Sequence, residues 1–503
     1  MGRKDAATLF YMNFVTTVVY LSILLNSSIA VKPRGFSLKM IRSDSQESPL
    51  YRGDHLTEAE RLERLVRQSK ARAHYYGSKT SSHNKSSMNP DIVRLPVELA
   101  HQQQYYYLVE VGIGTFSSQA QAYNDYYLIM DTGSDLTWIQ CEGGTSYFYQ
   151  DAPFFPHQDS STYDPIPCKD NPGVCDEQHC NDAGYCMYEQ GYVSGQTTSG
   201  DLAFEKFTTG SSTGEEFLET VELVMGCGFK QKNWGYGLGV PDIGDGHQLP
   251  QPLPRRGKAL VAGVLGLGQG DFSTLIHQFY YYEGKFAYCL ESHASPAVAG
   301  SHTYLRFGSD ATIGGGPEAV HTTPIYRNPD FGTPYYLHLE DISIGDRRVN
   351  FTSRDFEIKP DGKRGTIIDS GAPLSTLSRP HFERVKKVLV EYMEAQGARV
   401  DATAATHTHL DPCFDIPPTF DPNKFPTMTF HFQQADYVLD QVSDIFFSND
   451  HDDGSLLCFS ILGVDGDPYD FTLGAMQQAH KRILYDVNGK SLLFTKENCQ
   501  MAS

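Results

Sequence analysis

The chain has 503 residues, of which 40% are hydrophobic and 20% charged, and this composition excludes a disordered or fibrous protein. At roughly 100–200 residues per domain, the length suggests two to four domains, or two large β domains. The formal net charge of −20 argues against nucleic acid as the main partner, because binding a phosphate backbone requires concentrated Lys and Arg.

The charge is unevenly distributed along the chain. Residues 31–90 hold 12 Lys and Arg against 6 Asp and Glu, whereas residues 91–503 hold 27 against 54. A basic segment therefore precedes a strongly acidic body. Charge alone is equally compatible with two ordinary solvated surfaces.

Residues 1–30 have the features of a signal peptide. Arg3 and Lys4 precede an apolar run from Leu9 to Leu25, and Ser28-Ile29-Ala30 is a small-x-small cleavage pattern. We expect cleavage near Ala30; because the run is long, an uncleaved membrane anchor is the alternative. Nothing later in the sequence predicts a membrane span or a GPI signal, so we expect no membrane attachment after cleavage.

The next segment, residues 31–80, is predicted to be a distinct module that contains a helix. Thr57-Glu58-Ala59-Glu60 is a capping-box pattern, and Leu62, Leu65 and Val66 follow at helical spacing. Residues 77–90 are rich in Ser, Asn and Lys, which indicates an exposed linker and a region open to cleavage.

From about Tyr105 the sequence predicts a mainly antiparallel β protein. Short β-branched and aromatic runs between glycines predict strands at 106–113, 126–130, 221–225, 335–344, 366–368 and 483–485. One amphipathic helix is expected at 380–396, with Phe382, Val385, Val388, Leu389 and Tyr392 on the face packed against the sheet. Residues 231–258, rich in Gly and Pro, indicate a surface loop.

Ten cysteines, an even number, accompany the secretory signal, so disulfides are expected. Cys168, Cys175, Cys180 and Cys186 are close enough in sequence to suggest zinc, but the absence of a C-x-x-C spacing argues against it. His407 and His409 are assigned to the surface. We expect no metal and no cofactor. Asn84-Lys85-Ser86 and Asn350-Phe351-Thr352 are glycosylation sequons that support secretion weakly.

Two acidic tripeptides carry the chemistry. Asp131-Thr132-Gly133, followed by Ser134, ends the apolar run Leu128-Ile129-Met130; Asp369-Ser370-Gly371, followed by Ala372, ends Thr366-Ile367-Ile368. One such tripeptide is usually a turn, but two at equivalent places, 238 residues apart, indicate an internal duplication. Each has a later apolar-apolar-Gly partner, Val264-Leu265-Gly266 and, more loosely, Thr472-Leu473-Gly474.

This arrangement resembles the pepsin-like aspartic proteases and, within them, the plant nepenthesin-like group. The resemblance covers about residues 35–499. It is carried by the strings 107–115, Asp131 to Trp138, Gly226-Cys227-Gly228, Ala262 to Gly268, Phe286 to Leu290 and Tyr335-Tyr336-Leu337, and 35–57 is similar to that group's propeptide. It implies an all-β, bilobal pepsin-like fold with the active-site cleft between the lobes. The expected division is 1–30 signal peptide, 31–90 basic propeptide and linker, 91–300 N-terminal lobe with Asp131 and a Cys-rich insertion, and 301–503 C-terminal lobe with Asp369.

The resemblance implies that Asp131 and Asp369 form a catalytic pair. Two carboxylates about 3 Å apart cannot both ionise, so they share a proton over a wide acidic range. One then takes a proton from a water that attacks the peptide carbonyl, and the other donates to the carbonyl oxygen. Thr132 and Ser370 are expected to brace the two loops through their hydroxyls, Gly133 and Gly371 to permit the turns, and Ser134 to bond the outer oxygen of Asp131.

The resemblance also places a substrate-covering flap. Tyr192, in the string 192–200, aligns with the flap tyrosine, and Trp138 with the tryptophan that hydrogen-bonds it; Tyr188 is the alternative tyrosine. By resemblance, Cys413 bridges Cys458 and Cys289 bridges Cys499, with the other pairings open.

Two departures from the group's pattern have consequences. Ala372 replaces the usual hydroxyl residue and leaves Asp369 one hydrogen bond short, which predicts a raised pKa and an upward-shifted pH optimum. Cys141 lacks the group's nearby second cysteine, so one bridge is expected to be absent.

The resulting function is a secreted aspartic endopeptidase made as a zymogen, acting on polypeptides in the extracellular space or vacuole. Its own propeptide would be the inhibitor, and we expect a monomer. The alternative is a catalytically inactive protein on the same fold that binds a ligand or inhibits glycosidases; the presence of both aspartates favours the enzyme. A glycosidase would not explain two Asp-Thr/Ser-Gly turns, and Gly266-Leu267-Gly268 is not a dinucleotide-binding motif.

Overall fold

The fold is taken from a computed structural model of the chain. It describes residues 35–48, 51, 58–81, 107–117, 122–169, 171, 175, 179–192, 196–209, 219–232, 260–270, 273, 284–292, 301–328, 332–359, 363–451 and 454–499. The expected signal peptide, the end of the expected linker with Asn84, and most of the expected loop at 231–258 lie outside the described residues. Residues 35–503 form one compact unit.

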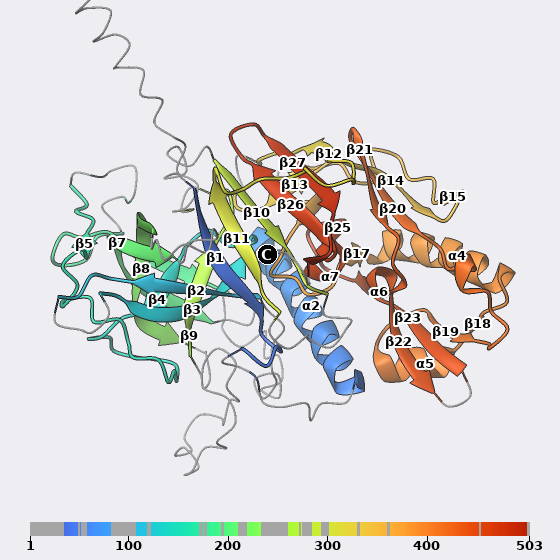
Figure 1. Ribbon diagram of the computed structural model, residues 1–503, viewed down its shortest axis with the longest axis horizontal. Coiled ribbons are helices and arrows are strands. Elements are labelled where there is room, and N and C mark those ends of the chain that lie inside the picture. The colour runs from blue at the N-terminus through green and yellow to red at the C-terminus, as the bar shows by residue number, and fades with distance from the viewer. Residues whose placement is uncertain are drawn as a thin grey trace, which may run out of the picture. The chain divides into compact units, whose positions relative to one another are not determined.

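Strands dominate the described chain, as the sequence predicted (Figure 1). The helices are α2 (Glu58–Ser81), α4 (Arg379–Ala395), α5 (Ala402–Thr408), α6 (Val442–Ile445) and α7 (Ala475–Gln478), with a 3₁₀ helix η4 (Pro422–Lys424). The capping-box segment forms α2, and the expected helix at 380–396 is α4, which buries Phe382, Val385 and Leu389. No helix among the described residues is both long and apolar enough to cross a membrane.

The largest sheet extends through both halves of the chain. Its order is β12 (His321–Pro324), β27 (Ser491–Lys496), β26 (Lys481–Asp486), β10 (Lys285–Cys289), β11 (Thr303–Gly308), β1 (Gly35–Arg42), β2 (Tyr107–Ile113), β3 (Asn124–Asp131), β9 (Val261–Gly266), β4 (Trp138–Gln140), β8 (Glu219–Lys232), β7 (Thr197–Thr209) and β5 (Asp164–Pro165). β6 (Met187–Gly191) pairs with β7, and β7 also pairs with β2, so the N-terminal strands close on themselves.

The C-terminal half adds smaller sheets. One has the order β13 (Tyr335–Leu337), β16 (Thr366–Ile368), β25 (Phe471–Leu473), β17 (Thr376–Ser378), β24 (Leu462–Val464). A second is β15 (Arg347–Arg348), β14 (Leu339–Ile344), β20 (Met428–Phe432), β21 (Ala435–Leu439), and a third is β18 (Arg399–Val400), β19 (Cys413–Ile416), β23 (Gly454–Phe459), β22 (Phe446–His451).

The basic N-terminal segment is built into this body. β1 pairs with β11 on one side and β2 on the other, so the backbone hydrogen bonds of both neighbours depend on it. Its Phe36, Leu38 and Met40 are buried in the main core. The expectation of a distinct module is therefore wrong, because an amphipathic helix and an apolar strand both need a partner to bury their apolar faces.

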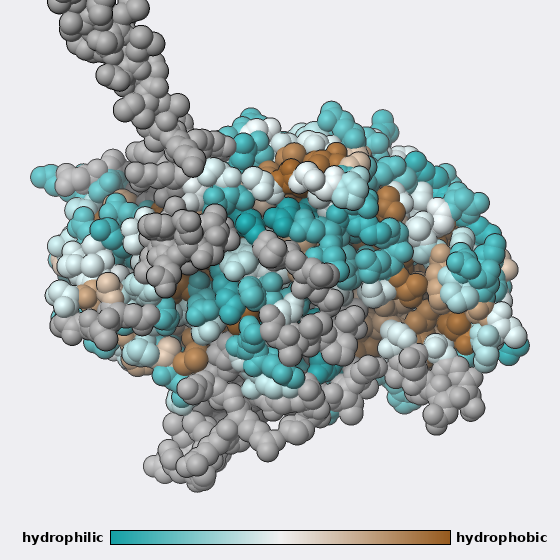
Figure 2. All heavy atoms as spheres, viewed as in Figure 1, coloured by the Kyte–Doolittle hydropathy of each residue, from teal (hydrophilic) through white to brown (hydrophobic). Residues whose placement is uncertain are grey.

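Most of the described surface on the face shown in Figure 2 is hydrophilic, as expected for a chain with so many acidic residues. Hydrophobic residues gather there in small patches, one of them near β12 and β27. The apolar side chains instead fill a core of aromatic and aliphatic residues contributed by strands from both halves. This core fixes the two strand ends that carry Asp131 and Asp369.

Candidate active site

The two acidic tripeptides occupy equivalent places in the two halves. β3 ends at Asp131 and runs parallel to β9, with Asp131 paired to Gly266. β16 ends just before Asp369 and runs parallel to β25, and the Asp369 N–H donates to Leu473 O at 3.0 Å. The later apolar-apolar-Gly segments are thus the strands that support each aspartate. The internal duplication inferred from sequence is present in the fold.

The two loops are joined by a reciprocal pair of hydrogen bonds. The Thr132 N–H donates to Ser370 Oγ at 3.1 Å, and the Ser370 N–H donates to Thr132 Oγ1 at 2.8 Å. All four of these atoms are buried, so the bonds are shielded from water. They fix the distance between the loops and hence between the carboxyl groups.

Each glycine serves its own aspartate. The Gly133 N–H donates to Asp131 Oδ1 at 3.0 Å, and the Gly371 N–H donates to Asp369 Oδ1 at 2.9 Å. A Cβ atom on Gly371 would lie 2.3 Å from Asp131 Oδ1, so a side chain there would collide with the opposite carboxyl group. Only glycine lets the two aspartates come this close.

The outer oxygens of the two carboxyl groups differ in their partners. Ser134 Oγ donates to Asp131 Oδ2 at 2.7 Å. At the matching position the methyl group of Ala372 is buried and offers no hydrogen bond. The asymmetry anticipated from the sequence is therefore present in the local structure.

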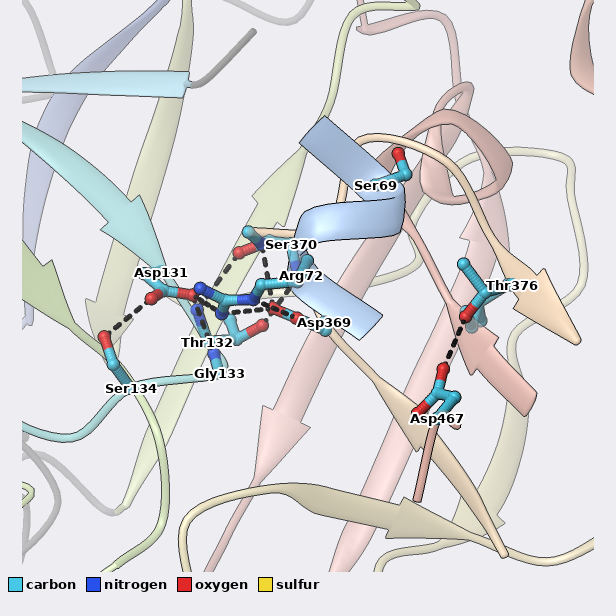
Figure 3. A network of polar contacts seen from close by, with 12 residues as sticks. Ser69, Arg72, Asp131, Thr132, Gly133, Ser134, Asp369, Ser370, Thr376 and Asp467 are labelled. Carbon is cyan, nitrogen blue, oxygen red and sulfur yellow. Dashed lines mark hydrogen bonds and ion pairs between the residues drawn. The ribbon is translucent and has the colours of Figure 1, made fainter. Parts of the chain in front are cut away.

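Arg72, from helix α2, lies between the two carboxyl groups (Figure 3). Its Nη2 is 2.6 Å from Asp131 Oδ1 and 3.1 Å from Asp369 Oδ1, and its Nε is 2.9 Å from Asp369 Oδ2. A single nitrogen atom thus bonds the inner oxygens of both aspartates. No sequence motif marks Arg72; the available signal is its place one turn beyond Ser69 on the apolar face of the predicted helix.

Asp369 is fully buried and its pKa is raised above the ordinary value. Burial is the largest cause, and the neighbouring Asp131 carboxylate also raises the pKa; Arg72 opposes both, through its charge and its hydrogen bonds. Asp369 therefore holds a proton more tightly than an exposed carboxyl group does. The two neighbouring carboxyl groups titrate as a unit.

Helix α2 is anchored beside the pair by apolar contacts. Its Leu62, Leu65, Val66 and Ala73 belong to a buried cluster that includes Leu374, Leu462, Val464 and Met476 of the C-terminal half. Ser69 Oγ accepts the Leu374 N–H at 2.9 Å and donates to Leu65 O at 2.8 Å. These contacts of α2 keep the Arg72 side chain between the two aspartates.

The structure brings Tyr192 and Trp138 together. Trp138 Nε1 donates to the Tyr192 hydroxyl, and Tyr192 lies at the end of the β6–β7 hairpin with its N–H bonded to Gln196 O at 2.7 Å. The alternative, Tyr188, is buried and its hydroxyl is 2.9 Å from Thr198 Oγ1. Of the two tyrosines, Tyr192 has the position and the partner expected of a flap residue.

A second polar chain lies beneath the pair and was not found from sequence. The Tyr485 hydroxyl is hydrogen-bonded to the Thr132 side chain and lies 2.9 Å from the Tyr288 hydroxyl, which donates to Gln478 Oε1 at 2.6 Å. Tyr485 of strand β26 thus helps to hold Thr132 in the position from which it bonds Ser370. Three separate segments of sequence meet here, which no local motif could reveal.

All ten cysteines are paired in the structure. Cys413 is joined to Cys458 and Cys289 to Cys499, the pairings suggested by resemblance, and the others are Cys168–Cys180, Cys175–Cys186 and Cys141–Cys227. Cys141, for which no nearby partner was expected, is joined to Cys227 on β8, the strand beside β4.

The candidate metal-ligand groups within the described residues contain these cysteines. They are Cys141, His157 and Cys227, and Cys168, Cys175 and Cys180. Each group includes a disulfide, whose sulfurs are not thiolate ligands. Asn350, the described sequon residue, is exposed and follows β15.

Comparisons with known proteins agree on the family. The family described as "Xylanase inhibitor N-terminal" matches residues 107–309, and "Xylanase inhibitor C-terminal" matches 334–496. The chain is 31% identical to the aspartyl protease AED1 of Arabidopsis thaliana, over 78% of this chain and 72% of that protein. It is 28% identical to the aspartic proteinase nepenthesin-2 of Nepenthes gracilis, over 89% of this chain and 88% of that protein.

Solved structures show the same fold. Edgp aligns with a TM-score of 0.57 and 17% identity, covering 78% of this chain and 94% of its own, and the soybean basic 7S globulin with 0.53 and 16%, covering 78% and 92%. The strand duplication, the paired aspartates and these relatives lead to one conclusion. The chain has the bilobal, mainly antiparallel pepsin-like fold and belongs to the pepsin-like aspartic proteases, in their nepenthesin-like group.

Proposed function

We propose that this chain is a secreted aspartic endopeptidase made as a zymogen, with Asp131 and Asp369 as its catalytic pair. The observation that carries the proposal is the position of Arg72 Nη2, which bonds the inner oxygens of both aspartates at 2.6 and 3.1 Å. In the processed protein, a water molecule at that point would be within hydrogen-bond reach of both carboxyl groups.

The chemistry follows from the shared proton. The ionised carboxyl group takes a proton from the water as its oxygen attacks the carbonyl carbon of the peptide bond. The protonated carboxyl group donates to the carbonyl oxygen, and the resulting diol collapses with proton transfer to the leaving nitrogen. Because the water attacks directly, no covalent bond to the enzyme forms, and no metal or cofactor is needed.

The basic segment is proposed to be the prosegment that keeps the protein inactive. The guanidinium group of Arg72 fills the place of the attacking water, and α2 covers the neighbouring surface through Leu62, Leu65 and Val66. Residues 77–90 are the proposed processing region, and residues 1–30 the signal peptide for export to the extracellular space or vacuole. Folding with the prosegment in place would keep the protease inert during transport.

A second function is favoured by the names of the matching families, which describe xylanase inhibitors. On that reading, the same fold would bind another protein without cleaving it. The intact pair argues against it, since both carboxyl groups, both glycines and the reciprocal Thr132–Ser370 bonds are present. A binding protein has no need for this arrangement.

The two functions are separated by one experiment. The secreted protein, processed to remove the prosegment, is incubated with a denatured protein between pH 3 and pH 6. Cleavage that is blocked by pepstatin and lost in Asp131→Asn supports the protease. No cleavage by the folded, processed protein under any of these conditions would favour the binding protein.

A further inference from the structure

Asp467 has a carboxyl group that interacts electrostatically with Asp369 and that the proposed chemistry does not use. It lies in the loop between β24 and β25, where Oδ2 accepts from Thr376 Oγ1 at 3.1 Å (Figure 3). Its Oδ1 accepts from the Tyr469 N–H at 3.0 Å. The side chain is only partly exposed. Both donors are neutral and belong to the same half, so no cation balances the carboxylate through these two bonds.

The carboxyl group lies on the face that α2 covers. Thr376 is paired with Leu462 on the neighbouring parallel strand, so the two side chains project from the same face of the sheet. Leu462 and Val464 on that face pack with the apolar residues of α2. When the prosegment leaves, this face becomes accessible to a substrate that extends from the catalytic pair.

Two other carboxyl groups, those of Asp470 and Asp369, lie near Asp467. Burial is the main reason that the pKa of Asp467 is raised to about 7, and the carboxylates of Asp470 and Asp369 raise it further. Asp470 is itself paired with Arg364 at 3.0 Å and lies 3.7 Å from His381. The carboxylates of Asp470 and Asp369 favour a positive charge placed beside Asp467, whereas burial by itself disfavours a charge of either sign.

We propose that Asp467 forms a specificity subsite that selects a lysine or arginine side chain of the substrate. The proposal rests on the proposed protease function. A cationic side chain would donate to the lone pairs of the carboxylate that Thr376 and Tyr469 leave free. Its apolar stem would lie along the surface of Leu462 and Val464, which α2 covers in the zymogen.

Asp465 provides a matched control. It lies two residues away in the same loop, but its side chain is 76% exposed and its carboxyl group is 3.3 Å from Arg379 Nε. It already has a cationic partner and lies outside the apolar surface under α2. Removing its charge changes the net charge of the loop by the same amount as removing that of Asp467, without altering the subsite.

The test uses the processed protein and a peptide library randomised around the scissile bond. We expect enrichment of Lys and Arg at one position. For a matched peptide pair with Lys or norleucine at that position, we expect the kcat/KM ratio to stay near 1 at pH 4 and to rise towards about 10 above pH 7, where Asp467 has lost its proton. Titration of the catalytic pair affects both peptides equally and cancels in the ratio.

In Asp467→Asn the ratio should stay near 1 at every pH while the norleucine peptide is still cleaved, and in Asp465→Asn it should follow the parent protein. A pH-dependent lysine preference that survives Asp467→Asn would overturn the proposal, as would a library without any basic preference. If the parent protein cleaves no peptide, the protease function itself fails, and the subsite falls with it. Cleavage without basic preference refutes the subsite alone.

Discussion

Replacing Arg72 with Ala should give the unprocessed protein measurable protease activity. Removing one partner of a buried ion pair costs about 3–5 kcal/mol when the remaining charge stays unpaired. Here the cost is lower, because Asp369 can take up a proton and Asp131 keeps its bonds from Ser134 and Gly133. We therefore expect the closed form to lose about 2–3 kcal/mol, which increases the open fraction roughly 30- to 160-fold.

The apolar contacts should keep most of the mutant protein closed. Each buried Leu or Val contributes about 1.5–3 kcal/mol, and Leu62, Leu65 and Val66 of α2 remain in place after the substitution. The expected phenotype is thus an intact chain with latent activity, rather than a prosegment that has come away. Arg72→Met, which keeps most of the bulk, should show the same gain.

The assay is the initial rate of cleavage of a fluorogenic peptide by the full-length chain, with a gel of the same sample to verify that no processing has occurred. Arg67→Ala is the control, because Arg67 is on the same helix but pairs with Glu63. We expect less than about a 2-fold change in that variant. Equal latent rates in the parent, Arg67→Ala and Arg72→Ala would refute the blocking role of Arg72.

Two further predictions concern the processed enzyme. Ala372→Ser supplies a hydroxyl donor to the outer oxygen of Asp369, which lowers the pKa of the pair. The acidic limb of the pH–rate profile should therefore move down by about 0.5 unit. Coincident acidic limbs in the two proteins would contradict this prediction. Tyr192→Phe removes the hydroxyl that accepts a hydrogen bond from Trp138. We expect kcat/KM to fall about 5-fold while the Tm stays unchanged. An unaltered kcat/KM would show that this hydrogen bond does not position the flap.

Much of the fold could be predicted because the sequence pattern is locally consistent. Three elements could be predicted from the apolar pattern within their own residues. They are the strand ending at Asp131, the strand before Asp369 and the amphipathic helix α4. The placement of β1 could not be predicted in this way. Its apolar residues show that it must be buried, but its pairing with β11 joins residues more than 250 positions apart.

The site shows the same division between local and long-range information. The two tripeptides, their bracing hydroxyls and the hairpin tyrosine were accessible from motifs and resemblance. Arg72, Asp467 and Tyr485 were missed, because each reaches the site from a segment with no motif of its own. The partner of Cys141 was missed for a related reason, since β4 and β8 are adjacent in space and 86 residues separate the two cysteines.

The charge contrast between the basic segment and the acidic body now has a more specific meaning. Arg42 and Arg61 contact Asp44, and Arg67 contacts Glu63, so these ion pairs lie within the segment itself. Among the described ion pairs, those of Arg72 are the ones that reach Asp131 and Asp369. A single buried guanidinium group, rather than a general attraction between two surfaces, would then couple the prosegment to the pair.

This geometry predicts that processing is faster at pH 4 than at pH 7. Burial is the largest cause that raises the pKa of Asp369, and part of it ends when α2 leaves, together with the lowering by Arg72; Asp131 raises this pKa in both forms. We expect the loss of the positive charge of Arg72 to be the larger effect. The open pair therefore binds a proton more tightly than the closed pair, and acidification shifts the equilibrium towards opening. In Arg72→Met that coupling is absent. The processing rate at pH 4 divided by that at pH 7 should then fall. It should approach the same rate ratio measured when the processed protein cleaves an unrelated peptide. An unchanged ratio in this variant would show that another group senses the pH.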